Sequence, residues 1–245
     1  KRYEANVNAW LLQKNEDSLL ACFTHRPSSY GWQGEHVGKW IAAATLAWAN
    51  SRNVRLREKL DVVVKTLLRT QLPDGYLGTY QNNFHWAMGK ELNWDVWVHK
   101  YNLLGLITYA RYTGDQQALD AAKGIADLLN RTFGAGGKLS LNKRSTFRGL
   151  ASGSVLEPIV LLYRVTNDVR YLQFALYIVD QWEQPEGSHI ITSLTKGAAV
   201  NTIGSGKAYE MLSCLNGLCE LFRATADQRF LTPVLKAWTD IVENQ

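Results

Sequence analysis

Apolar residues recur along the chain at the three- to four-residue spacing of α-helices, and short polar breaks interrupt them. Four stretches share one order: an apolar helical segment, a break, and a second segment with a single apolar face. They cover residues 45–68, 108–129, 161–182 and 220–242. The aligned leucines Leu56, Leu119, Leu172 and Leu231 lie 63, 53 and 59 residues apart. This repeat predicts four αα-hairpins in series.

The polar breaks contain residues that end one helix and begin the next. The breaks lie at 50–52, 113–115, 166–168 and 225–227. Gly114 and Asn167 favour the left-handed backbone that terminates a helix. Asp115, Asp168 and Asp227 are suited to cap the following helix through its free N–H groups. We therefore expect loops of two to four residues inside each hairpin. Longer connections between hairpins then lie near 71–93, 131–150 and 183–204.

The two helices of a hairpin differ in polarity. Residues 41–44 and 103–106, in first helices, are almost entirely apolar or small, whereas residues 55–65, in a second helix, carry many charges. This contrast favours an α/α toroid, in which the first helices are buried inside a ring. Six hairpins of this length need roughly 330 residues. We therefore expect residues 1–245 to form one all-α domain, an incomplete (α/α)6 barrel and a fragment of a larger domain.

Composition narrows the class of protein. The chain has 245 residues, 46% of them hydrophobic, with 27 basic and 22 acidic side chains and a net charge of +5. These values are typical of a folded globular protein. No apolar run is long enough to span a membrane, and no basic block predicts nucleic-acid binding. The three cysteines, Cys22, Cys214 and Cys219, are predicted to be buried thiols rather than disulfide partners. Secreted, periplasmic and cytoplasmic locations all stay open.

Residues at a matching level of the four first helices form the candidate site. Fourteen residues before the breaks stand His36, His99, Ser152 and Met211. If a ring axis relates the hairpins, side chains near this level converge at one mouth of the ring. The candidate sugar-binding residues there are His36, Trp94, Trp97, His99, Glu157, Lys207 and Glu210. Aromatic faces cover the C–H side of a sugar, and histidines and carboxylates bind its hydroxyls.

Each candidate also has a purely structural interpretation. A tryptophan at the start of a helix is commonly a core residue, and His99 on an apolar helix could be a hydrogen-bonded core histidine. Glu157 before Pro158 is typical of the first turn of any helix. Lys207 and Glu210, three residues apart, could form a surface ion pair. No Walker loop, HExxH motif or GxSxG elbow is present to support another chemistry.

Several stretches resemble the β-L-arabinofuranosidase-type glycoside hydrolases, a family of six-hairpin toroids. They are GEHVGKWIAAATLAWA (34–49), DGYLGTY (74–80), WDVWVHKYNLLGLITYARYTGDQQAL (94–119), GSVLEPIVLLYRVTNDVRYL (153–172) and GKAYEMLSCLNGLCELFRATADQRFL (206–231). The resemblance covers most of the chain in the family's order.

The resemblance implies a sugar contact for His99, and it implies that Ser152 and Lys207 replace histidines found in some members. Glu157 matches an acid of other members. It also implies a cysteine nucleophile beside a zinc ion that cysteines and a glutamate hold, all after the fourth hairpin. Cys214 and Cys219 do not match those ligands, so we expect no zinc ligand and no nucleophile in this chain.

Three functions stay open on the sequence alone. The first is a toroid glycoside hydrolase that binds a carbohydrate substrate at the mouth of the ring, with no nucleic-acid or membrane partner. The second is a non-catalytic carbohydrate-binding toroid. The third is another α/α-toroid enzyme, such as a polysaccharide lyase or an epimerase. An open ring would expose two apolar edges, which favours self-association.

Overall fold

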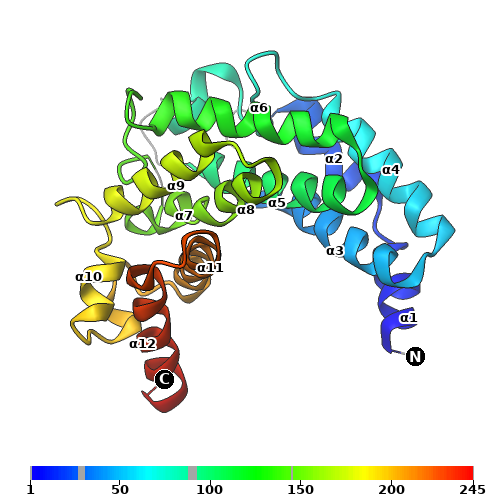
Figure 1. Cartoon of the computed structure of the whole chain (residues 1–245). Helices are drawn as coiled ribbons and strands as arrows, with labels where there is room; N and C mark the ends of the chain where they lie inside the picture. The colour runs from blue at the N-terminus through cyan, green and yellow to red at the C-terminus, as the bar shows by residue number, and fades with distance from the viewer. Residues whose placement is uncertain (1, 27–30, 88–92, 145, 245) are drawn as a thin grey trace. The chain divides into compact units, whose positions relative to one another are not determined.

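A computed structural model describes residues 2–26, 31–87, 93–144 and 146–244 of the chain (Figure 1). Its helices are α1 (Arg2–Asn6), α2 (Glu16–His25), α3 (Glu35–Ser51), α4 (Val54–Leu68), α5 (Asp95–Thr113), α6 (Gln116–Phe133), α7 (Leu150–Gly153), α8 (Leu156–Thr166), α9 (Val169–Trp182), α10 (Ile190–Thr195), α11 (Ala208–Thr225) and α12 (Gln228–Asn244). Short 3-10 or π-helical turns lie at Val7–Leu11, Trp32–Gly34, Asn82–Ala87, Phe147–Gly149 and Val200–Thr202. No helix in the described ranges has the length and apolarity that crossing a membrane requires.

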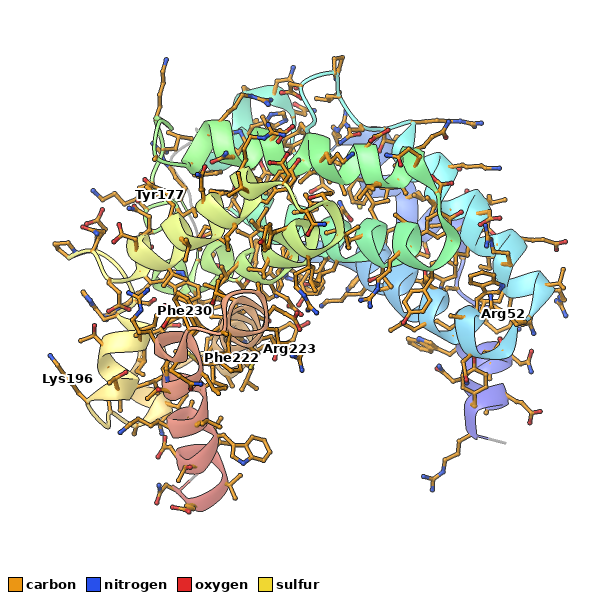
Figure 2. The ribbon with its side chains drawn as sticks, viewed as in Figure 1. Arg52, Tyr177, Lys196, Phe222, Arg223 and Phe230 are labelled. Atoms are coloured by element: carbon orange, nitrogen blue, oxygen red, sulfur yellow. The ribbon has the colours of Figure 1, made fainter. Side chains whose placement is uncertain are left out.

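The four predicted hairpins are confirmed. They are the pairs α3 and α4, α5 and α6, α8 and α9, and α11 and α12, which can be followed by colour in Figure 1. Two residues separate the helices of each pair. The first break lies later than the sequence predicts, because α3 continues to Ser51 and ends at Arg52, labelled in Figure 2.

Left-handed residues terminate the first helix of every pair. Gly114 and Asn167 adopt φ angles of 77° and 55°, as predicted. Arg52 and Ala226 adopt φ angles of 55° and 57°, although neither side chain favours this conformation. The repeated geometry therefore overrides the local preference at two of the four breaks.

The residue after each left-handed position caps the second helix. The caps are Asn53, Asp115, Asp168 and Asp227, whose side-chain Oδ1 atoms each accept a hydrogen bond from a backbone N–H. The donors are Leu56, Ala118, Arg170 and Arg229, at N···O distances of 2.9, 2.8, 3.0 and 2.9 Å. The three predicted aspartate caps are confirmed, and Asn53 is the equivalent cap of the first hairpin.

Backbone contacts group the chain into two compact units. The first consists of Lys1–Met88 and Val98–Leu128, and the second of Gly89–Trp97 and Leu129–Gln245. Each unit is described by itself below. That residues 1–245 form a single domain stays a prediction.

In the first unit, α3 and α5 approach each other at glycines. A Cβ atom on Gly38 would lie 2.1 Å from the carbonyl oxygen of Tyr101, and one on Gly105 would lie 2.7 Å from the carbonyl oxygen of Gly38. Gly105 also lies beside Ile41, so the two helices run side by side in the same direction. This approach places the first turn of α3 beside the second turn of α5.

In the second unit, α11 packs along α8. A Cβ atom on Gly217 would lie 2.9 Å from the Cβ atom of Leu156. The short helix α7 precedes α8, so the first helix of the third hairpin begins only at Leu156. Ser152, which lies in α7 and is fully buried, donates hydrogen bonds to the carbonyl oxygens of Leu141 and Gly149 at 2.7 and 3.1 Å. This serine is therefore held by the backbone of the connection before it.

Candidate functional site

Four rings form a cluster in the first unit, which we call the histidine cluster: Tyr76, His85, Trp86 and His99. Tyr76 and His85 stack with ring centroids 3.6 Å apart and an interplanar angle of 13°. His99 meets Tyr76 at 4.8 Å and Trp86 at 5.1 Å. The rings come from the connection between α4 and α5 and from the second turn of α5. The first long connection thus folds over the start of α5.

His99 is fully buried and hydrogen-bonded to the backbone. The N–H of Leu77 donates to its Nε2 atom at 3.0 Å. Because Nε2 accepts, the neutral ring carries its proton on Nδ1. Asn102, one turn further along α5, donates from Nδ2 to the carbonyl oxygen of Leu77 at 2.8 Å. The peptide groups of Leu77 are thus bound on both sides by α5, and His99 has the surroundings of a core histidine. Its contact with a sugar stays a prediction.

His85, like Tyr76 and Trp86, is a member of this cluster that is not among the predicted site residues. Its Nε2 lies 3.0 Å from the carbonyl oxygen of Tyr80. Burial lowers the pKa of His85, while the hydrogen bond to Tyr80 and the charge of Asp74 oppose this effect and Arg26 adds to it. The signal that could have found the cluster is the DGYLGTY stretch at 74–80, where Tyr76 lies between glycines.

His36 lies on the first turn of α3 and is exposed. Its ring meets the ring of Trp32 edge-on at 5.4 Å. Gly38 and Tyr101, two residues after His36 and His99, are in backbone contact. The two histidines therefore lie at the same level of adjacent helices, as counting back from the breaks predicts.

Four further aromatic rings form a second cluster, in the second unit, which we call the tryptophan cluster: Trp94, Trp97, Phe147 and Tyr209. Trp94 meets Trp97 at 5.8 Å and Phe147 at 5.6 Å, and Trp97 meets Tyr209 at 5.5 Å, all edge to face. The ammonium group of Lys207 lies 5.4 Å from the ring centroid of Phe147. Three predicted site residues, Trp94, Trp97 and Lys207, are thus brought together from distant parts of the sequence.

The side chains of the tryptophan cluster differ in their exposure to solvent. Trp97 is 2% exposed, Trp94 and Phe147 are half-buried, and Tyr209 is 47% exposed. Phe147 adopts a φ of 56°, and Arg148 and Gly149 continue with φ of 53° and 82°. Left-handed backbone at two successive non-glycine residues is strained and is found where a structure fixes a functional side chain. The cluster therefore presents a partly open aromatic surface on a constrained turn.

The two predicted glutamates lie at different levels of their helices. Glu210 is 2% exposed in the first turn of α11, one turn from Lys207. Glu157 lies on α8 and follows Leu156, which packs against Gly217 of α11, ten residues beyond Lys207. Ten residues of helix span about 15 Å. The structure therefore brings Glu210, but not Glu157, to the level of Lys207.

The three cysteines, Cys22, Cys214 and Cys219, are free thiols. Cys214 is buried as predicted, whereas Cys22 and Cys219 are half-buried. Burial raises the pKa of Cys22 to about 11, opposed by a backbone hydrogen bond, and burial also raises the pKa of Cys219, with smaller contributions from neighbouring charges. Within the described ranges, no three His, Cys, Asp or Glu side chains lie close enough together to hold a metal ion. That zinc ligands lie outside this chain stays a prediction.

The fold and sequence together define a class of protein. Residues 7–245 match the family model described as beta-L-arabinofuranosidase, GH127 catalytic domain. The chain belongs to this family. Its all-α series of helical hairpins is of the α/α-toroid class, as the sequence predicted.

One similar protein is a non-reducing end beta-L-arabinofuranosidase from Bifidobacterium longum subsp. longum, 29% identical over 157 residues, which make up 61% of this chain and 23% of the relative. A solved GH127 beta-L-arabinofuranosidase from Geobacillus stearothermophilus T6 superposes with a TM-score of 0.72 at 20% identity, over 100% of this chain and 42% of that structure. A solved GH127 beta-arabinofuranosidase gives 0.70 at 19% identity, over 98% and 39%. The chain spans from about a quarter to two-fifths of these relatives.

Proposed function

We propose that this chain is part of the catalytic domain of a glycoside hydrolase of β-L-arabinofuranosidase type, and that it contributes to binding the sugar of a carbohydrate substrate. The observation that carries the proposal is the tryptophan cluster, in a chain that matches the GH127 family over residues 7–245. Its exposed edge combines an aromatic ring, Tyr209, with a cation, Lys207. This combination suits a ligand that has an apolar C–H face and a rim of hydroxyls.

The proposed roles follow from exposure and chemistry. Tyr209 and the partly exposed Trp94 offer aromatic surface to the sugar, and Trp97 supports them from below. Lys207 donates hydrogen bonds to hydroxyls, and the carboxylate of Glu210 accepts them. In the first unit, His36 is exposed and can reach a ligand.

Two further residues have weaker support. His99 would act through its Nδ1–H, since its Nε2 accepts from Leu77. For Glu157, the proposed contact with a sugar rests on the sequence argument alone.

We assign no nucleophile to this chain. Raised pKa values keep Cys22 and Cys219 as neutral thiols, which are poor nucleophiles, at neutral pH. We propose that the nucleophile and any zinc ligands lie outside these 245 residues. The part played by this chain is then to bind and orient the sugar.

The test uses the protein that contains this chain and an aryl β-L-arabinofuranoside as substrate. We expect release of L-arabinose, and we expect Lys207→Ala and Tyr209→Ala each to raise KM by about tenfold, the loss of one cation or aromatic contact. Tyr112→Ala is the matched control, because Tyr112 is 45% exposed and lies in the first unit.

Other outcomes point to the alternatives. Sugar binding without turnover would indicate a carbohydrate-binding toroid. An unsaturated, ultraviolet-absorbing product from a polysaccharide would indicate a lyase. Either result would overturn the proposed hydrolase.

A further inference from the structure

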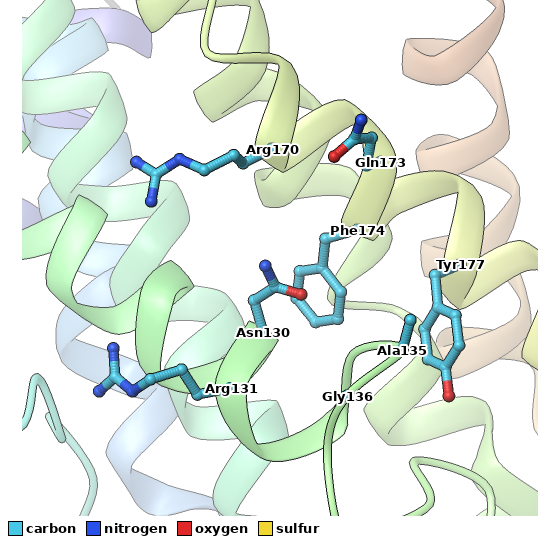
Figure 3. A pocket seen from close by; sticks show the side chains of 8 residues that line it. All are labelled: Asn130, Arg131, Ala135, Gly136, Arg170, Gln173, Phe174 and Tyr177. Atoms are coloured by element: carbon cyan, nitrogen blue, oxygen red, sulfur yellow. The ribbon is translucent and has the colours of Figure 1, made fainter.

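The second unit has a cavity between the end of α6 and α9 (Figure 3). Its volume is about 620 Å³, within the range of pockets that bind small molecules. None of its residues belongs to either aromatic cluster. The cavity therefore has no role in the proposed sugar site.

The walls of the cavity are held in place by the backbone and the core. Behind the last turn of α6, the N–H of Gly134 donates to the carbonyl oxygen of Asn130 at 2.8 Å, and the N–H of Gly137 donates to that of Gly134 at 2.7 Å. A Cβ atom on Gly137 would lie 2.4 Å from the carbonyl oxygen of Thr132, so the turn is tightly folded. On the other side, Phe174 of α9 is 2% exposed and anchors the floor. The cavity is therefore preformed.

Side chains with unused hydrogen-bonding groups face this space. In the part of the chain that the structure describes, the side chains of Asn130, Gln173 and Tyr177 make no hydrogen bond. Each amide offers two donors and an acceptor, and the phenol offers one donor and accepts as well. Figure 3 shows Asn130 and Phe174 in the middle of the cavity and Tyr177 at one end. The arrangement is an apolar floor flanked by groups that both donate and accept.

Two arginines stand at the other end, Arg131 from α6 and Arg170 from α9 (Figure 3). Asp168 binds the guanidinium of Arg170, with Nη2···Oδ2 at 2.6 Å and Nε···Oδ1 at 3.1 Å. This ion pair offsets the positive charge of Arg170. The cavity is thus better suited to a neutral polar ligand than to a strongly charged anion.

We propose that this cavity binds a neutral oligosaccharide. Sugar hydroxyls both donate and accept, as do the groups of Asn130, Gln173 and Tyr177, and the half-buried ring of Tyr177 can cover the C–H face of a sugar. The site is a carbohydrate-binding surface additional to the one proposed above. The choice of a sugar as the ligand of this cavity rests on the proposed function.

The experiment is hydrogen–deuterium exchange of the full chain with an arabinofuranose trisaccharide as the probe. We expect the trisaccharide to slow exchange in peptides covering 130–137 and 170–177. Tyr177→Ala and Gln173→Ala should raise the apparent Kd read from these peptides by about three- to tenfold. Gln173 is exposed, so its truncation leaves the core intact. The matched control Tyr112→Ala should keep the wild-type protection.

Two results would overturn the proposal. One is unchanged exchange in both peptides at millimolar trisaccharide. The other is equal protection by inorganic phosphate together with displacement of the trisaccharide, which would make this an anion site. Hydrolysis of an aryl monosaccharide by the whole protein is measured in parallel. If the whole protein does not hydrolyse this substrate, the proposed function fails but the cavity proposal does not. Binding at the cavity is measured separately, from exchange in the peptides covering 130–137 and 170–177.

Discussion

The histidine cluster and the tryptophan cluster are built alike but differ in how far their side chains are exposed to solvent. Each joins rings from a connection between hairpins to rings near the start of a helix. In the histidine cluster, His99 is fully buried and accepts a backbone hydrogen bond. In the tryptophan cluster, the contacts end in Tyr209, which is nearly half exposed, and in the exposed Lys207.

This difference separates the structural role of the histidine cluster from the binding role that we propose for the tryptophan cluster. Burying an aromatic ring stabilises the fold through the apolar area removed from water. An aromatic ring left in water beside a cation gains little for folding, so its value lies in what it can contact. Substitutions in the histidine cluster should therefore change mainly the free energy of unfolding. Substitutions in the tryptophan cluster should change mainly the affinity for a ligand.

The largest expected effect comes from the helix contact under the histidine cluster. Gly38→Val would place a Cβ atom 2.1 Å from a backbone carbonyl oxygen of Tyr101, and neither backbone can move without separating α3 from α5. We expect a loss of about 4 kcal/mol or more in the free energy of unfolding, measured by urea denaturation.

Gly136→Ala is the matched control, because an added Cβ there meets nothing within 4 Å. It should change stability by less than about 1 kcal/mol. A Gly38→Val protein as stable as the wild type would show that α3 and α5 do not pack as described.

The next effect compares the clusters directly. His99→Ala leaves a cavity and an unsatisfied N–H on Leu77, so we expect a loss of about 3 kcal/mol in the free energy of unfolding. Tyr209→Ala removes one edge-to-face contact with Trp97 from the surface, and should cost about 0.5–1 kcal/mol. Both values come from urea unfolding of the same protein. Equal costs would abolish the distinction between a structural and a binding cluster.

The sequence predicted the hairpins well because their signals are local. Gly114, Asn167 and the three aspartate caps lie within two residues of the breaks they form. The repeat also placed His36 and His99 at one level, since Gly38 and Tyr101, each two residues further along, are in backbone contact.

The sequence predicted the site less well because its remaining geometry depends on irregular segments. Glu157 and Lys207 are the exception, because counting back from their breaks already separates them by nine residues of helix. Phe147 joins the tryptophan cluster from a strained turn whose φ angles are set by tertiary contacts rather than by residue type. His85 stacks on Tyr76 within the same connection, and no periodic pattern in the sequence marks this contact.

The smallest effect is a pH dependence that belongs to the histidine cluster alone. Burial lowers the pKa of His85 below its ordinary value of 6.5, so the unfolded chain binds this proton more readily than the folded one. The free energy of unfolding therefore rises with pH through the window below about 6.5, and the contribution of His85 is lost as the pH falls through its folded pKa. We expect His85→Gln to lose less stability than the wild type between pH 7.5 and pH 5, in urea titrations at both values. Asp74 opposes the shift and Arg26 favours it, so Asp74→Asn should steepen the wild-type dependence. Parallel pH dependences in the wild type and His85→Gln would mean that the stacked imidazole is as easily protonated in the folded protein as in water.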